Sequence, residues 1–202
     1  MYRVILASES PRRKEIMEQM GIPFQAMGSS KAEVAAEKEP AAMVQALAAI
    51  KAKDIASKIA EPKDTAADTI IIGADTMVFF RGNALGKPKD KVDAVRMLQM
   101  LSDEEHEVYT GVNIIIHPAK GNFKSFSFAV CTKVLVRALT REQIENYVAT
   151  GEPMDKAGAY AIQGKFGIYI KEIHGDYYNI VGFPIAKIHE KLLEQGIDLL
   201  NI

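Results

Sequence analysis

Hydrophobic residues in this chain fall into β-branched runs separated by stretches with helical signals. The first run is "YRVILA", and longer ones follow at "DTIIIGADTMVFF", "EVYTGVNIIIH" and "FKSFSFAVCTKVLV". Runs of this composition predict buried strands, and the last two are expected to pair around a turn at Gly121-Asn122. Because strands alternate with helices along the chain, the pattern predicts an α/β fold with a mixed sheet.

Helix-start and helix-stop residues divide the remaining sequence. Ser10 stands at an N-cap position before Pro11, Gly21 supplies a stop, and a Thr-x-x-Gln cap begins at Thr140. The segment 22–39 between the first two helices is expected to be irregular. The expected helices are 11–20, about 40–60, about 90–101, 140–151 and one after Pro184.

Two segments are harder to assign. The letters "GAD" interrupt the run from 68 to 80, which predicts a buried strand, a kink at the glycine and a second extended segment, with Asp75 at the end of the first strand. The stretch 152–185 has many glycines among strand-like runs. Its glycines indicate either backbone close to a ligand or tight turns, and the sequence does not separate the two.

Two adjacent arginines break a local rule in the first helix. Arg12 and Arg13 occupy its first turn, where the helix dipole makes a cation unfavourable by roughly 0.3–1 kcal/mol each. An anionic ligand would compensate, with Ser8 and Ser10 as further donors, and this phosphate-sized site is the favoured interpretation. The alternative is that both guanidinium groups simply point into water.

The helix at about 40–60 places a lysine among apolar residues. On a helical wheel Lys51 lies in the middle of the apolar stripe, whereas Lys53 points the opposite way. Lys51 either extends its ammonium to the edge of the fold or directs it into a cleft, and the helix alone favours neither. The stripe consists of Val44, Leu47, Ala48, Ile55 and Ile59.

Asp75 is the acidic residue with the strongest functional signal. It lies within a long apolar run, where a carboxylate is costly unless it has a cation or a catalytic task. Other separated carboxylates are Glu33, Glu152, Asp155 and Asp176. Together with the cations Arg12, Arg13, Lys51 and Lys87, they suit metal-assisted phosphoryl or nucleotidyl chemistry.

Composition and charge exclude several other classes of protein. The chain has 202 residues, 48% of them hydrophobic, and a net charge of −1, so it fits one domain or two small lobes and has no basic field for nucleic acid. Cys131 is the single cysteine, which excludes an internal disulfide. No apolar run is long enough to span a membrane, and a cytoplasmic location is expected.

Motif spacing removes further chemistries. The segment "GNALGKP" has three residues between its glycines, where a P-loop needs four, and Pro88 takes the position of the magnesium-binding Ser or Thr. There is no dinucleotide-binding fingerprint, no zinc-protease motif and no nucleophile elbow. Redox, zinc-hydrolase and acyl-transfer chemistry therefore have no support.

Seven segments in register resemble the Maf family of nucleoside triphosphate pyrophosphatases over essentially the whole length 1–202. These segments are "LASESPRR", "KA" at Lys51, "IIGADT", "LGKP", "HEVYTGV", "EPMDKAGAYAIQG" and "GDYYNIVGFP". The resemblance implies a single domain, with a long mixed sheet flanked by helices and two lobes around a central cleft. It also implies a homodimer.

The resemblance implies a role for each matched residue. Asp75 would be the catalytic carboxylate, and Glu33 with Asp75 would hold a divalent cation, Mg²⁺ or Mn²⁺. Gln163 would select the base and matches the branch acting on dTTP and UTP, since a branch acting on 7-methyl-GTP has an acidic residue there. The triphosphate would be bound by Ser8, Arg12, Arg13, Lys51 and Lys87.

One departure and three alternatives accompany this assignment. The family has an acidic "SDVDE"-like run before the glutamate, whereas this chain has "SSKAE", with Ser30 and Ala32 in place of two aspartates.

The alternatives are a non-catalytic nucleotide-binding regulator of septum formation, a nucleic-acid binder using the 12–14 basic patch, and a pyrophosphatase acting on a modified or purine triphosphate. The near-neutral net charge argues against the second.

Overall fold

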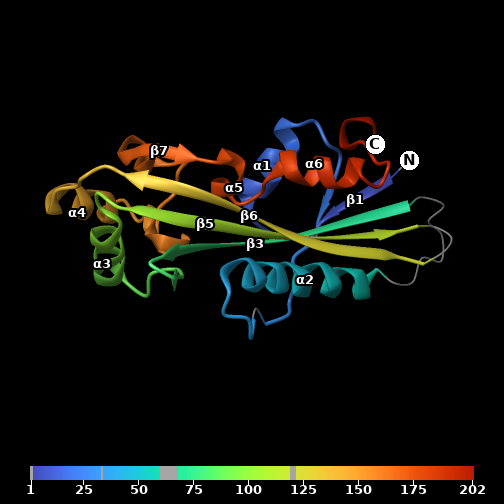
Figure 1. Cartoon of the computed structure of the whole chain (residues 1–202), viewed down its shortest axis with the longest axis horizontal. Helices are drawn as coiled ribbons and strands as arrows, with labels where there is room; N and C mark the ends of the chain where they lie inside the picture. The colour runs from blue at the N-terminus through green and yellow to red at the C-terminus, as the bar shows by residue number, and fades with distance from the viewer. Residues whose placement is uncertain (1, 33, 60–67, 119–121) are drawn as a thin grey trace. The chain divides into compact units, whose positions relative to one another are not determined.

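The computed structural model describes residues 2–32, 34–59, 68–118 and 122–202. These residues form a mixed α/β fold whose sheet has the strand order β2-β1-β3-β5-β6-β7, with β4 paired to β3 (Figure 1). The strands are β1 (Tyr2–Leu6), β2 (Gln25–Ala26), β3 (Asp68–Phe80), β4 (Asn83–Leu85), β5 (Glu105–His117), β6 (Lys124–Val136) and β7 (Ile170–His174). The expected fold class is confirmed.

Most helices agree with the start and stop signals in the sequence. The exception is the short helix 177–181, which lies in the stretch 152–185 expected to be strand-like, where the Asp176 carboxylate accepts a hydrogen bond from the Tyr178 backbone N–H at 2.8 Å. The helices are α1 (Pro11–Gln19), α2 (Pro40–Lys58), α3 (Lys91–Leu101), α4 (Arg141–Ala149), α5 (Tyr177–Val181) and α6 (Ile185–Leu193). Asp90 caps α3, and the capping box predicted for α4 is present, with Thr140 and Gln143 bonded reciprocally. Short 3-10 helices are η1 (Glu152–Asp155), η2 (Ala157–Ala159), η3 (Lys165–Tyr169) and η4 (Leu199–Asn201).

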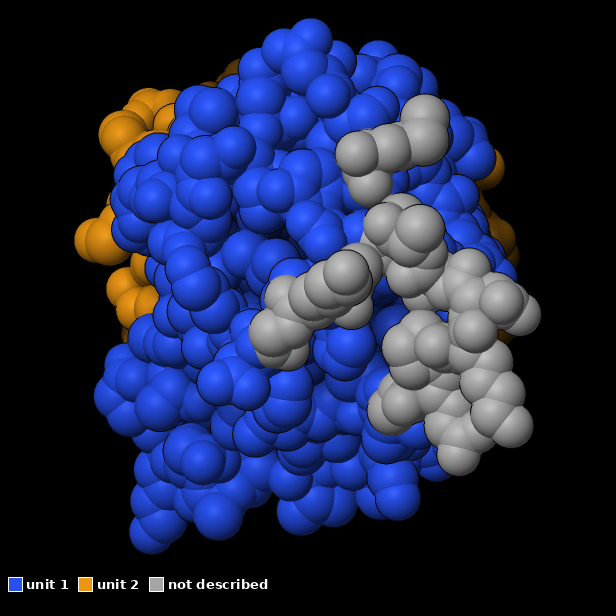
Figure 2. All heavy atoms as spheres, turned by 90° about the vertical axis from the view of Figure 1, so that its right-hand side faces the viewer, with its two compact units in different colours: residues 1–75, 110–130, 182–202 blue, residues 76–109, 131–181 orange. Residues whose placement is uncertain are grey.

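The described chain divides into two compact units, coloured separately in Figure 2. Unit 1 consists of residues 1–75, 110–130 and 182–202, and unit 2 of residues 76–109 and 131–181. Strands β3, β5 and β6 each contribute residues to both units. The cleft expected between two lobes stays a prediction.

Each unit has its own hydrophobic core. In unit 1, the core cluster is Ile5, Ala7, Ala52, Ile55, Ile71 and Ile115, drawn from β1, α2, β3 and β5. In unit 2, α3 and α4 pack together over residues such as Val78, Leu98, Val134, Ile144 and Phe166. Burying a side chain of this size stabilises the fold by about 1.5–3 kcal/mol, so both units have the apolar material for a packed interior.

Helix α2 lies very close to the sheet of unit 1. A Cβ atom on Gly73 of β3 would be 2.5 Å from the carbonyl oxygen of Ala48, and one on Gly111 of β5 would be 2.5 Å from the backbone nitrogen of Gln45. Figure 1 shows α2 on one face of the sheet and α1 and α6 on the other. The two glycines therefore create the space in which the helix backbone rests.

This contact corrects the interpretation of "GAD". Strand β3 runs without interruption from Asp68 to Phe80, so the predicted kink is wrong and Asp75 lies inside a strand rather than at its end. Gly73 is needed for its small size, because α2 covers it, and not for a change in backbone direction.

Three other segments differ from expectation or lie outside the structure. The glycine-rich stretch 152–169 forms the 3-10 helices η1 to η3 instead of strands, since Gly158 and Ala159 have φ angles of 68° and 62° that a strand does not allow. The segment 22–39 contains β2, which is too short to show an alternating pattern. Gly121 of the expected turn lies outside the described residues.

We predict that Gly111→Ala destabilises the protein, because the new methyl group would meet backbone atoms of Val44 that cannot rotate away. Overpacking of this kind costs about 1–3 kcal/mol, and each kcal/mol lowers Tm by about 2–4 °C in a chain of this size. Thermal unfolding of the variant measures the loss. The matched control is Gly86→Ala, whose Cβ would meet nothing within 4 Å. Equal Tm values for the two variants would contradict the close approach of α2.

Candidate active site

The turn after β1 buries a serine and an arginine together. Ser8 and Arg13 are only 7% and 8% exposed. The Ser8 Oγ accepts hydrogen bonds from the Ser10 backbone N–H at 3.2 Å and from Arg13 Nη1 at 3.1 Å. Arg13 Nε donates to the carbonyl oxygen of Gly182 at 2.7 Å. Arg13 therefore points into unit 1 and links the start of α1 to the segment between α5 and α6.

These contacts answer the question raised by the arginine pair. The alternative in which both arginines point into water is wrong for Arg13, because its guanidinium group is buried against protein acceptors. Arg12 is half-buried, and its neighbour Lys14 pairs with Glu9 at 2.8 Å. Ser10 is the N-cap residue but its side chain makes no capping hydrogen bond. At the start of α1, the side chains of Arg13 and Lys14 therefore bind groups outside the helix and do not cap its backbone.

Helix α2 directs Lys51 inward, so the interpretation in which its ammonium extends to the edge of the fold is wrong, and its position in a cleft stays a prediction. Its Nζ lies 2.7 Å from Oδ1 of Asp75, and the side chains are 11% and 10% exposed. Residues 73 and 75 lie on the same face of β3, and Gly73 is the residue that α2 covers. The close approach of α2 to Gly73 therefore brings the ammonium group within hydrogen-bonding distance of the carboxylate.

The strand register places Ser8 and Asp75 at a similar level along the sheet. Strands β1 and β3 pair in parallel, with Leu6 opposite Ile72, and Ser8 and Asp75 follow these paired residues by two and three positions. β1 ends at this level whereas β3 continues to Phe80, and ligand sites of α/β proteins are commonly built beyond the carboxyl end of a parallel strand such as β1.

The other expected site residues belong to unit 2 or lie outside the described residues. Lys87 follows β4, Gln163 lies between η2 and η3, and both are exposed residues of unit 2. Their grouping with the residues of unit 1 stays a prediction. Glu33 lies outside the described residues.

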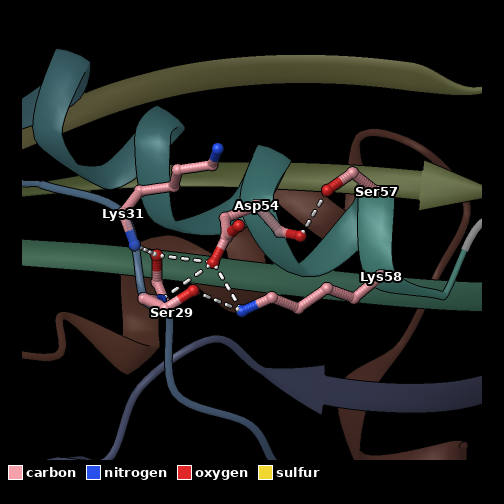
Figure 3. Close-up of polar contacts among 6 residues, drawn as sticks. Ser29, Lys31, Asp54, Ser57 and Lys58 are labelled. Atoms are coloured by element: carbon pink, nitrogen blue, oxygen red, sulfur yellow. Dashed lines mark hydrogen bonds and ion pairs between the residues drawn. The ribbon is translucent and has the colours of Figure 1, made fainter.

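A polar cluster that the sequence analysis missed holds the segment 29–31 to α2 (Figure 3). Asp54 Oδ2 accepts hydrogen bonds from Ser29 Oγ at 2.9 Å, from the Ser30 backbone N–H at 3.0 Å and from Lys58 Nζ at 2.8 Å. Lys58 also donates to Ser30 Oγ at 3.1 Å. The hydrogen bond from Lys58, supported by that of Ser30, lowers the pKa of Asp54 to about 2.

The i, i+4 spacing of Asp54 and Lys58 was the one sequence signal of this cluster. The two serines were not recognisable as partners, because they are 24 and 25 residues away along the chain. The hydroxyl of Ser30, one of the two residues noted above as departing from the expected acidic run, accepts from Lys58. The segment is thus tied to α2 by hydrogen bonds.

Across the described ranges 2–32, 34–59, 68–118 and 122–202, His, Cys, Asp and Glu side chains form no group of three or more that could hold a metal ion. Asp75 is a suitable donor by chemistry, since Mg²⁺ and Mn²⁺ prefer carboxylate oxygen.

Across those same described ranges, helices fall short of the length and apolar character needed to cross a bilayer.

Fold and site together define a mixed α/β protein with a buried Ser–Arg pair just after β1 and a buried Lys–Asp pair between α2 and the interior of β3. The model of the family described as "Maf-like protein" matches residues 3–195, and the chain belongs to this family. The resemblance found in the seven sequence segments is confirmed.

Curated relatives match over the full chain. A protein of Lachnoclostridium phytofermentans is 47% identical over 201 residues, covering 100% of this chain and 99% of its own. Proteins of Agathobacter rectalis and Bacillus anthracis are each 44% identical, covering 98% and 100% of this chain and 100% of their own. All three are named dTTP/UTP pyrophosphatase.

Solved structures with a detectable likeness are more distant. The Staphylococcus aureus Ham1 protein is 12% identical with a TM-score of 0.45, and a HAM1 protein of Coxiella burnetii is 11% identical with a TM-score of 0.46. Each comparison covers 96% of this chain and 100% of the other.

We predict that Lys51→Met destabilises the protein, because it leaves the buried Asp75 carboxylate without its cation. Removing one partner of a buried ion pair costs about 3–5 kcal/mol. Chemical denaturation measures the free energy of unfolding. Lys53→Met, an exposed position on the opposite side of α2, is the control and should change it little. A stability equal to that of the control would show that the pair contributes nothing.

The lowered pKa of Asp54 predicts a specific acid sensitivity. Its stabilising contribution is fully present above the unfolded-state pKa near 4 and is lost as the pH falls through that value toward 2. The free energy of unfolding should therefore fall less steeply between pH 5 and pH 2 in Asp54→Asn than in the wild type. The exposed Asp103→Asn should keep the wild-type slope. Parallel curves for all three proteins would contradict the assignment.

Proposed function

We propose that this chain hydrolyses dTTP, UTP and related pyrimidine nucleoside triphosphates to the monophosphate and pyrophosphate. The observation that carries the proposal is the buried Lys51–Asp75 pair in a chain that belongs to the Maf-like family. Further support comes from full-length relatives, 44–47% identical, that are named for this activity.

In the proposed reaction, water attacks the α-phosphorus. A bond forms between the water oxygen and this phosphorus, and the bond from phosphorus to the α,β-bridging oxygen breaks. The electron pair of that bond leaves with pyrophosphate, and a proton of the water is released to a base. This chemistry needs one group to orient the water and several cations to stabilise charge on the leaving group.

Asp75 is the proposed catalytic carboxylate. Lys51 bonds to Oδ1 and thereby fixes the direction of the carboxylate. In the proposal, Oδ2 accepts the hydrogen bond of the attacking water and takes its proton. Burial of the pair supports this role, because a fixed polar group in a water-poor site acts more strongly than one in solvent.

Cationic groups are proposed to bind the triphosphate. Arg12 and Lys87 are the more accessible of them, whereas Arg13 is anchored by Gly182 and holds Ser8 in the turn. Lys51 would act on both Asp75 and the phosphates. Gln163 would read the base through its amide, which donates as well as accepts.

A divalent cation, Mg²⁺ or Mn²⁺, is proposed to be held by Asp75 and Glu33. When bound, it would neutralise phosphate charge. Ser30 and Ala32 supply no carboxylate, and the Ser30 hydroxyl accepts from Lys58, so the proposed site has fewer acidic ligands than the family pattern. The homodimer and the cytoplasmic location expected from the sequence also stay predictions.

Pyrophosphate release from a panel of canonical and modified triphosphates tests the proposal. We expect release from dTTP and UTP with the matching monophosphate, and its loss in the presence of a chelator. Asp75→Asn keeps an oxygen to accept from Lys51, so it should fold but lose on the order of 10²–10³ in rate. Asp103→Asn is the matched control.

Wild-type rates in Asp75→Asn would refute the role of this carboxylate. Binding of nucleotides by the folded wild type without turnover of any of them would favour the non-catalytic regulator instead.

A further inference from the structure

The segment that carries Gln163 is a short loop between two buried aromatic residues. Tyr160 is 6% exposed and Phe166 is fully buried, whereas Gln163 is exposed between them. The ring centroid of Phe166 lies 4.9 Å from that of Tyr160 and 5.0 Å from that of Tyr147. The two ends of the loop are therefore fixed in the core of unit 2.

Two side chains, Tyr147 of α4 and Glu152 of η1, hold the loop backbone between these ends. The hydroxyl of Tyr147 donates to Glu152 Oε1 at 2.8 Å and accepts from the Ala161 backbone N–H at 3.3 Å. Glu152 Oε2 accepts from the Lys165 backbone N–H at 3.2 Å. One phenol–carboxylate pair thus binds the loop two residues before and two residues after Gln163.

Gly164 allows the carboxylate to reach this position. A Cβ atom on this residue would lie 2.5 Å from Cδ of Glu152 and in contact with both carboxylate oxygens. Because Gly164 has a φ of −99°, alanine fits its backbone conformation, so the lack of a side chain serves only to admit Glu152. The loop is built around the carboxylate.

A carboxylate accepts both hydrogen bonds made to Glu152 at once. Both oxygens act as acceptors, whereas a glutamine would present an NH₂ group to one of the two donors. Burial and the hydrogen bond to Glu152 raise the pKa of Tyr147, which keeps its hydroxyl proton in place as the donor.

We propose that Tyr147 and Glu152 are positioning residues that fix the Gln163 loop and thereby set which nucleobase the enzyme accepts. This inference rests on the proposed function, in which Gln163 reads the base. It assigns specificity to residues that themselves need not touch the substrate. Misplacing a recognition group by about 1 Å can reduce a rate by about 10²-fold, so a small loss of loop order is enough to be measured.

Three variants each disturb a different part of this arrangement. Tyr147→Phe removes the hydroxyl, Glu152→Gln replaces one acceptor oxygen by an NH₂ group, and Gly164→Ala places a methyl group where the carboxylate lies. We expect all three to lower kcat/KM for dTTP and UTP about 10- to 100-fold, mainly through a higher KM. Discrimination against purine triphosphates should fall, while inhibition by pyrophosphate, which lacks a base, should be unchanged. The matched control is Glu145→Gln, on the same helix, whose carboxylate binds Arg141 at 2.6 Å.

A double variant separates positioning from general stability. If Tyr147 acts through Gln163, then Tyr147→Phe should cost much less in a Gln163→Ala background than alone, because the two residues form one coupled unit. Additive effects would overturn the inference.

Amide hydrogen exchange gives a readout that does not depend on activity. Exchange at Ala161 should accelerate in Tyr147→Phe, and exchange at Lys165 should accelerate in Glu152→Ala, since each amide loses its acceptor. Glu145→Gln should leave both amides as in the wild type.

The outcomes distinguish the two proposals. A wild type that releases pyrophosphate, with unchanged base discrimination in the three variants, would overturn this inference and leave the proposed function standing. A fall of kcat that is equal for all triphosphates would assign the pair a purely structural role and would also overturn it. A wild type that turns over no triphosphate would overturn the proposed function, and this inference with it.

Discussion

The close packing of α2 against the sheet of unit 1 is the contact on which the candidate site depends. Two positions without side chains, Gly73 and Gly111, let the helix backbone rest directly on β3 and β5. At this distance a lysine on the inner face of α2 reaches a carboxylate two residues beyond Gly73, and the pair replaces the water that each group would otherwise need. A larger residue at either glycine would lift the helix and separate the charges.

The polar groups of unit 1 are held in place by partners within the fold. Arg13 binds the backbone carbonyl of Gly182, and Asp54 binds Ser29 and Ser30. These contacts fix the turn that carries Ser8 and hold residues 29 and 30 against α2, the helix of Lys51. In the proposed reaction, such pre-organisation would lower the entropy lost when the triphosphate binds.

The loop of Gln163 in unit 2 is built on the same principle. A glycine admits a charged group from a neighbouring element, and that group then orders the backbone around an exposed side chain. Gly73 and Gly164, which lie in two of the seven family segments, are thus explained by the groups that pack against them: the α2 backbone against Gly73 and the Glu152 carboxylate against Gly164. Neither Gly73 nor Gly164 is required for an unusual backbone angle.

The sequence by itself determined the α/β class, the bounds of most helices, the α4 capping box and the inward direction of one face of α2, because these follow from local periodicity and local hydrogen bonds. It also carried the family resemblance. It did not determine the unbroken course of β3 or the 3-10 turns of 152–169. Only the tertiary structure decided that Lys51 meets Asp75, that Arg13 meets Gly182 and that Glu152 meets the Gln163 loop. These contacts join residues 13 to 169 positions apart, and a local pattern contains no information about which distant residue packing will bring near.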